Sequence, residues 1–427
     1  MPFAKNQTIK EKRLNQQCKV FHLKLHWSHL SRPKREYLKL LFLEKKWLRN
    51  HILAQEDVFD LSLTKLKSVQ IKVKDNFESR ELNNLSSQMK QSIFFEIGNN
   101  IKALSNSKNN GNNIGKLKFV SECNMLELVQ NEITYKLRGN YLYLQGFKGS
   151  FKINGAKQIP LNADLANAKL IRKPSGIYLY VTCYVDKLNK QLPDAQIGLD
   201  FGIKDNIIDS NGNKYNWQFN ESDRLKRASR KLNRNWQRNK LQSNLNQKPK
   251  SKKQEKIYRL EFEKLSNRKK DAKNKFCSWL KNNHNLIAIQ DENLHEWKSS
   301  KMKGWGKRVH HSIMGGIISD IKSMPHTTII DKWHPTTQLC PNCGLLNKHS
   351  LDKRIYSCEC CNYSEDRDTH SAKNIKQIGI NHRLSLSQMQ NWTVGDRPYL
   401  DEAIIIPRAV SFENQMNLLG TTPEAFD

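Results

Sequence analysis

The chain has 427 residues, with 72 lysines and arginines against 41 aspartates and glutamates, which gives a net charge of +31 at pH 7. Its mean hydropathy is −0.75, and no apolar run approaches the roughly 18–20 residues that a membrane span needs, so a membrane protein is excluded. An excess of positive charge this large requires a polyanionic partner, and we expect nucleic acid because binding releases counterions from phosphates.

The first half of the chain predicts a helical block followed by a β-rich block. Residues 1–29 form an N-terminal segment with one alternating strand at 19–25, and 30–110 carry two amphipathic helices. The polar run Ser105–Asn113 is expected to be a linker or mobile loop. Short alternating runs over 111–192 predict a small β-barrel or sandwich, and one hypothesis is that the strand at 19–25 joins it.

The next region, 193–332, begins with a buried strand ending in Asp200 and a hairpin signal at Asn211–Gly212. Basic helices are expected over 222–282, split by Pro249. A solvated helix face is one interpretation of this charge, but like charges at such density repel unless phosphates neutralise them. The predicted nucleic-acid contacts on these helices are Arg224, Arg227, Arg230, Lys231, Arg234 and Arg238, with Trp236 as a base-stacking residue.

Five of the nine cysteines are clustered between Cys340 and Cys361, which points to a reducing compartment and a metal site rather than a disulfide framework. Two CxxC pairs, Cys340/Cys343 and Cys358/Cys361, provide four thiolates, and one structural Zn²⁺ is the usual occupant of such a site. Residues 333–365 therefore predict a zinc ribbon, with Cys360 as a spare. A metal-free loop and an iron centre stay open as alternatives.

Three acidic residues follow or begin predicted core elements. Asp200 ends one apolar strand, Glu292 follows another, and Asp368 precedes a predicted helix in 366–390. Taken singly, an aspartate at a strand end is more often a cap or turn residue. Carboxylates that converge from three elements would instead bind one or two divalent cations, and Mg²⁺ prefers oxygen ligands of this kind.

In these motifs the sequence resembles a known family, the TnpB-type transposon-encoded RNA-guided DNA endonucleases, which are related to the miniature type V CRISPR effectors. The matching segments, in family order, are Gly198–Lys204, Gln290–Leu294, Trp305–Arg308, the two cysteine pairs and Asp366–Ile375. Together they cover about 196–378. In the family the second acid usually stands directly after its strand, where this chain has Gln290; Glu292 is our choice and Asp291 the fallback.

The resemblance implies a bilobed, multidomain α+β protein, with a helical recognition domain and a β-barrel wedge domain before an RNase H-like (RuvC) α/β nuclease domain with an inserted zinc ribbon. It implies that two Mg²⁺ ions bind at Asp200, Glu292 and Asp368, that guide RNA and target double-stranded DNA are the partners, and that the protein acts as a monomer or homodimer. Lys307, Arg308 and Arg367 would contact nucleic acid. The protein would be cytoplasmic and nucleoid-associated, with a mobile acidic tail at 391–427.

Three other functions compete with this interpretation. A CRISPR effector would use crRNA instead of a transposon-encoded guide. A nuclease-derived repressor would bind DNA through its guide without cutting, and loss of an acid would mark it. A cut-and-paste transposase usually orders its acids Asp, Asp, Glu, whereas here the order is Asp200, Glu292, Asp368.

Overall fold

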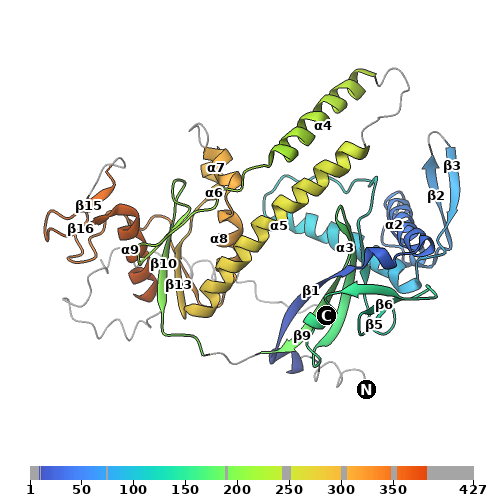
Figure 1. Ribbon diagram of the computed structural model, residues 1–427, viewed down its shortest axis with the longest axis horizontal. Helices are drawn as coiled ribbons and strands as arrows, with labels where there is room; N and C mark the ends of the chain where they lie inside the picture. Colours follow the sequence, from blue (N-terminus) through green and yellow to red (C-terminus); the bar gives the residue numbers. More distant parts are fainter. Residues whose placement is uncertain are drawn as a thin grey trace, which may run out of the picture. The chain divides into compact units, whose positions relative to one another are not determined.

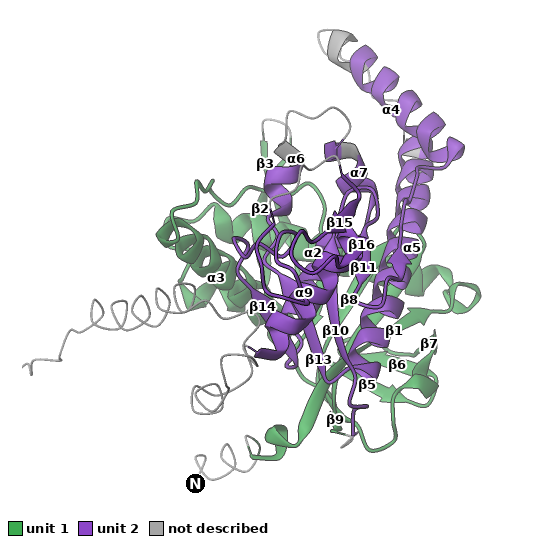
Figure 2. Cartoon of the chain, turned by 90° about the vertical axis from the view of Figure 1, so that its left-hand side faces the viewer, with its two compact units in different colours: residues 1–189 green, residues 190–427 purple. Residues whose placement is uncertain are grey.

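The computed structural model describes residues 9, 11–73, 76–187, 191–242, 252–299, 305–347 and 353–381. The chain divides into two compact units, unit 1 (residues 1–189) and unit 2 (residues 190–427), shown in Figures 1 and 2. The finer domain boundaries expected from the sequence stay a prediction, and the acidic tail lies outside the described residues. None of the described helices combines the length and apolar character that crossing a bilayer takes.

Unit 1 is built on a seven-stranded antiparallel sheet with the order β4-β8-β9-β1-β7-β6-β5. Its strands are β1 (Gln16–Leu25), β4 (Met125–Leu128), β5 (Tyr135–Arg138), β6 (Tyr141–Leu144), β7 (Phe151–Asn154), β8 (Asp164–Lys173) and β9 (Gly176–Asp186). The strand expected at 19–25 is therefore central, paired with both β7 and β9. Because the end strands β4 and β5 are not paired with each other in the described part, the sheet is open rather than a closed barrel.

Two amphipathic helices, α2 (Arg32–Leu53) and α3 (Ser87–Asn109), cover the inner face of this sheet. Pro33 lies in the first turn of α2, and the Ser86 hydroxyl caps α3 by accepting from the Met89 N–H. Short 3₁₀ helices lie at Trp27–His29, Leu61–Lys65 and Ala156–Gln158.

Two expectations for this block were wrong. A hairpin of β2 (Ser68–Val73) and β3 (Asn76–Glu81) interrupts the helical region, because Val69 and Ile71 alternate with polar residues in the pattern of a half-buried strand. The predicted linker begins too early, since α3 continues to Asn109. A packed helix propagates through Ser and Asn at little cost once its first turns are fixed.

Unit 2 contains a five-stranded mixed sheet with the order β12-β11-β10-β13-β14. The strands are β10 (Gln196–Phe201), β11 (Ile207–Asp209), β12 (Lys214–Tyr215), β13 (Leu286–Gln290) and β14 (Thr327–Ile330). β10, β11 and β12 are antiparallel neighbours, whereas β10, β13 and β14 run parallel. The hairpin expected at Asn211–Gly212 joins β11 to β12, and Gly212 takes the positive φ of +84° that the turn requires.

Helices cover both faces of this sheet. Ile287 and Ile289 of β13 face α5 (Lys252–Asn283) and α8 (Met314–Lys322), while Leu286 and Ala288 face α9 (Arg367–Asn381). The remaining helices are α4 (Asp223–Gln242), α6 (Leu294–Ser299) and α7 (Trp305–His311); the small strands β15 (Ile355–Ser357) and β16 (Ser364–Asp366) precede α9 (Figure 1).

Two glycines allow α9 to approach the sheet closely. A Cβ added at Gly198 would lie 2.2 Å from the carbonyl oxygen of Ala372, and one at Gly379 would lie 2.4 Å from the Cβ of Ala288. No larger residue fits at this contact without displacing the helix. The glycines therefore set the position of α9, which carries Asp368 and Ser371 toward the end of β10.

Candidate metal centres

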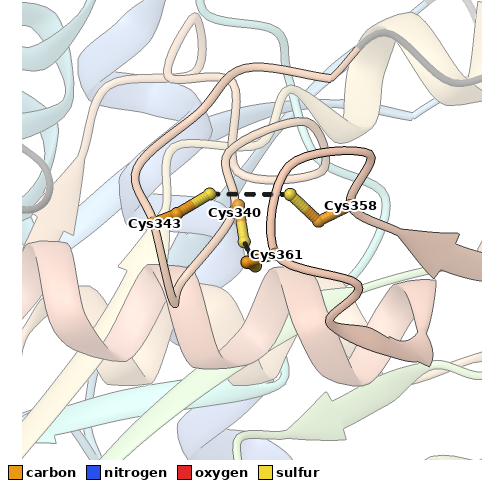
Figure 3. A group of neighbouring side chains, drawn as sticks. All are labelled: Cys340, Cys343, Cys358 and Cys361. Atoms are coloured by element: carbon orange, nitrogen blue, oxygen red, sulfur yellow. Dashed lines mark hydrogen bonds between the residues drawn. The ribbon is translucent and has the colours of Figure 1, made fainter.

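The four cysteines of the two CxxC pairs come together in unit 2, as the spacing predicts (Figure 3). The Sγ atoms of Cys340 and Cys361 are 3.5 Å apart, as are those of Cys343 and Cys358, and all four lie within 4.8 Å of one another. Four sulfurs at about 2.3 Å from a tetrahedral Zn²⁺ would be separated by about 3.8 Å. The cluster therefore fits a single zinc ion, and Cys360 is not part of it.

Both CxxC pairs make the same turn. The residue after each pair has a positive φ, +74° at Gly344 and +56° at Asn362. Asparagine tolerates this conformation because its short side chain can hydrogen-bond locally. Burial raises the pKa of the Cys358 thiol, but backbone N–H groups of Cys361 and Cys360, followed by side-chain hydrogen bonds, lower that pKa overall to about 6. The second pair therefore favours the thiolate at Cys358, whereas the pKa values of Cys340 and Cys343 in the first pair are raised, that of Cys343 to about 12.

The base of the ribbon is anchored on α9. The Tyr356 ring stacks on the buried His370 ring, with centroids 3.7 Å apart and 14° between planes. Asn374 Nδ2 donates to the carbonyl oxygens of Thr336 and Leu339, both at 2.7 Å. One helix thus holds the ribbon and carries the third predicted acid.

Asp200 lies within electrostatic reach of the other two predicted acids. Burial raises the pKa of Asp200 to about 8, and the negative charges of Asp368 and Glu292 contribute to that increase. Burial also raises the pKa of Glu292, together with the charges of Asp291 and Glu296. Among the described residues, the cysteine cluster is the one group of three or more possible metal ligands whose ligand atoms all lie within 4.8 Å of one another. The carboxylate oxygens of the three acids do not all lie within that distance of one another.

The acidic residues at this site differ in their ion-pair partners and in their burial. Asp368 accepts from Arg354 at 3.1 Å and forms an ion pair with Arg367 at 3.3 Å. Asp291, the fallback for the second ligand, is exposed and paired with Lys322. Glu292 is half-buried, and its charge contributes to the raised pKa of Asp200. The choice of Glu292 over Asp291 as the second ligand stays a prediction.

A buried polar network that sequence reasoning missed supports Asp200. The Ser371 hydroxyl lies 3.1 Å from Asp200 Oδ1 and 3.2 Å from Thr336 Oγ1, and Thr336 Oγ1 donates to Gln290 Oε1 at 3.0 Å. Gln290 Nε2 donates to three backbone carbonyls in the loop after β14. The Ser371 hydroxyl has one proton, so its donation to Asp200, which lowers the Asp200 pKa against the larger effect of burial, competes with donation to Thr336. The feature of the sequence that could have indicated this network is Gln290, a polar residue at the end of an otherwise apolar strand.

The predicted phosphate-binding residues fall into two groups. On α4 the side chains of Arg224, Arg227, Arg230, Lys231, Arg234, Trp236 and Arg238 are all exposed, while Leu225 and Ala228 are buried. Arg224 also pairs with Glu261 of α5 at 3.3 Å. Arg308 on α7 is exposed, whereas Arg367 lies at the acid site beside Asp368. The Lys307 side chain lies outside the described residues.

Comparisons with known proteins agree with this arrangement. The family "Cas12f1-like, TNB domain" matches residues 326–375, which contain the four cysteines and Asp368, and the family "Probable transposase" matches residues 180–300, which contain Asp200 and Glu292. Both matches are of the kind expected for a TnpB-type protein, the family that the sequence resembles.

Among curated proteins, the "Putative RNA-guided DNA endonuclease" of Streptomyces pristinaespiralis is 25% identical over 243 residues, which are 53% of this chain and 56% of that protein. The match thus spans little more than half of the relative's length. The cryo-EM structure of the Cas12f1–sgRNA–target DNA complex is similar with a TM-score of 0.46 and 11% identity, over 85% of this chain and 99% of that chain.

Proposed function

We propose that this protein is an RNA-guided DNA endonuclease that cuts target DNA by metal-dependent phosphodiester hydrolysis, next to a short flanking motif and under a transposon-encoded guide RNA. The observation that supports the proposal is the buried Asp200 at the end of β10, on whose pKa the charges of Asp368 and Glu292 act. The net charge of +31 and the exposed basic face of α4 support a nucleic-acid substrate.

The acid site would hold Mg²⁺. Its donors are carboxylate oxygens, which suit this ion, and a bound cation would stabilise the ionised form of Asp200, which burial and then the charges of Asp368 and Glu292 disfavour. Bound Mg²⁺ would supply an activated water and stabilise the leaving oxygen of the phosphodiester. Asp200 is oriented by Ser371, and Asp368 by the first turn of α9. We assign the sheet and α9 to an RNase H-like (RuvC) nuclease domain.

Unit 1 would hold the guide RNA and the flanking motif, and the basic side chains of α4 would contact the backbone of the guide–target duplex, while base pairing supplies sequence specificity. The zinc ribbon, stabilised by one Zn²⁺ at Cys340, Cys343, Cys358 and Cys361, would fix α9 through Tyr356 and the carbonyls that Asn374 binds.

The proposal is tested by cleavage of a matched DNA target with the full chain, its guide RNA and Mg²⁺. Asp200→Ala and Glu292→Ala should each abolish cutting and leave guide and target binding within about twofold of the unmodified protein, because these acids stabilise the transition state rather than the complex. Asp291→Ala, a matched control one residue away, should cut normally. Residual cutting by Asp200→Ala, or loss with Asp291→Ala alone, would contradict the assignment.

A second candidate function is guided DNA binding without cutting. Two observations favour it. Gln290, next to Ile289 in the strand that pairs with β10, uses its amide for four structural hydrogen bonds, and Asp368 is paired with two arginines. In the same experiment, this function would appear as tight guide-dependent target binding with no product at any Mg²⁺ concentration.

A further inference from the structure

The outer face of the unit 1 sheet carries aromatic and basic side chains in register across three strands. Along β9 the residues Leu179, Val181 and Cys183 are buried on the inner face, while Tyr178 and Tyr180 alternate with them on the outer face. On β1, the strand beside β9 in Figure 1, His22 is the register partner of Tyr180 and Lys24 that of Tyr178. On the other side of β9, Lys173 ends β8 opposite Gly176.

These side chains form one cluster. The rings of His22 and Tyr180 stack with centroids 3.7 Å apart and 7° between planes. The Nζ atoms of Lys24 and Lys173 lie 5.6 Å and 5.1 Å from the centroid of the Tyr178 ring. Lys173 Nζ also lies 5.0 Å from the centroid of the Tyr180 ring and donates a hydrogen bond to the Tyr180 hydroxyl. Cation–π attraction therefore positions two ammonium groups beside the same ring.

The charges of this cluster are not balanced within unit 1. Nearby, Lys169 and Arg172 of β8 pair with Glu127 and Glu122. Lys24 and Lys173 form no ion pair with a carboxylate in the described part of the chain. Two like charges held at one ring repel, and a single phosphate within reach of both would remove that repulsion.

The structure assigns this face, His22, Lys24, Lys173, Tyr178 and Tyr180, as a binding site for an unpaired nucleic-acid strand. The two lysines would bind a phosphate, and the ring column of His22 and Tyr180 would stack an exposed base. Stacking platforms flanked by cations are how proteins hold unpaired nucleotides, because every base has a π face. The inference depends on the proposed function only for the source of the strand, which would be an unpaired part of the guide RNA or the displaced DNA strand.

The test measures binding of a short fluorescent oligouridylate to the full chain, freed of co-purified nucleic acid, by anisotropy over a series of KCl concentrations. The Lys24→Ala/Lys173→Ala variant should lose about fivefold or more in affinity, and its log-affinity against log-salt slope should be smaller by about 0.7, the value for the one phosphate that the two lysines share. The control Lys102→Ala/Lys108→Ala removes the same charge from exposed positions of α3 and should change affinity by less than about twofold.

The stacking component has its own pair of variants. Tyr180→Leu should weaken binding about fivefold or more, whereas Tyr180→Phe, which keeps the ring, should stay within about twofold. Repeating the series with the deoxy oligonucleotide distinguishes the sources: losses confined to RNA indicate the guide, and equal losses with DNA indicate the displaced strand. Equal effects of the two lysine pairs, or unchanged binding by Tyr180→Leu, would overturn the inference. No cleavage is measured, so a failure of the proposed nuclease activity would leave this result intact.

Discussion

The most perturbed carboxyl group in unit 2 is that of Asp200, and its replacement has a predictable effect on stability. The pKa of Asp200 rises from 3.8 to about 8 in the metal-free protein, mainly through burial and then through Asp368. Because the folded-state pKa lies above the unfolded value, Asp200 contributes fully to the free energy of unfolding below about pH 4, and this contribution is lost as the pH rises toward 8. Asp200→Asn, which cannot ionise, should therefore be more stable than the unmodified protein by about 5 kcal/mol near pH 8.

This prediction is checked by thermal unfolding in EDTA across that pH window. The difference between the two proteins should shrink as the pH falls, and Asp291→Asn, at an exposed position, should show none. Parallel pH profiles for Asp200→Asn and the unmodified protein would contradict the proposed burial of the carboxyl group.

The sequence predicts the role of a residue where its chemistry agrees with its spacing from its partners. It does not predict a role that depends on partners far away along the chain. The four cysteines meet because two turns of fixed length bring each pair together. Asp200 and Glu292 approach because β10 and β13 are parallel neighbours, so their carboxyl ends share one edge. The role of Gln290 was not predictable, because its partners are backbone carbonyls more than forty residues away along the chain.

The position of α9 determines where Asp368 and Ser371 lie, and Gly198 determines how closely α9 packs on the sheet. A methyl group at Gly198 would collide with the backbone of α9 at Ala372 and Lys376, where neither neighbour can move without shifting the helix. Gly198→Ala should lower the free energy of unfolding by about 3 kcal/mol, the upper end of overpacking effects. Gly315→Ala on α8, where the nearest atom is 3.4 Å away, is the control and should be neutral or slightly stabilising. Urea unfolding measures both; equal midpoints would show that α9 packs less tightly than described.

The ribbon should depend on its metal. Cys343→Ser removes one of four ligands, so the purified protein should lose its single bound Zn²⁺, and α9 should exchange its amide hydrogens faster because the ribbon no longer holds His370 and Asn374. Cys360→Ser should retain one zinc per chain. Metal content by atomic emission and hydrogen exchange provide the two measurements, and zinc retention by Cys343→Ser would contradict the four-sulfur site.

The elements differ in how well the sequence predicts them. The basic helices α4 and α5, the hairpin at Asn211–Gly212 and the strands β10 and β13 form as expected, because period, charge and turn residues agree locally. The hairpin β2–β3 was missed because the alternation in β2 is only six residues long and its partner β3 contains a single apolar residue, Phe77. Phe262 of α5 is 52% exposed, so the apolar face of that helix narrows toward its N-terminal half.

For the protein as a whole, affinity for duplex should depend on salt through α4. Residues 224–275 hold 20 basic and 4 acidic residues, a net charge of +16. Replacing Arg227, Arg230 and Arg234 with alanine should reduce the log-affinity against log-salt slope for duplex by about 2.7, about 0.9 for each contact. These side chains are exposed, so the melting temperature should not change. A full slope in the variant would mean that the duplex binds elsewhere, and Lys102→Ala/Lys108→Ala again controls for charge.

The pairing of β1 with β9 also determines when unit 1 can be completed during synthesis. Gln16 lies opposite Asp186, so the central strand of the sheet leaves the ribosome some 170 residues before its partner. At about 5–20 residues per second, that interval lasts on the order of ten seconds or more, during which the backbone hydrogen-bonding groups of β1 have no strand on that side. A nascent chain in this condition exposes a strand edge that can pair with other chains. Chaperone occupancy on translating ribosomes should therefore be highest before β9 emerges, and slow codons after residue 186 should improve the soluble yield.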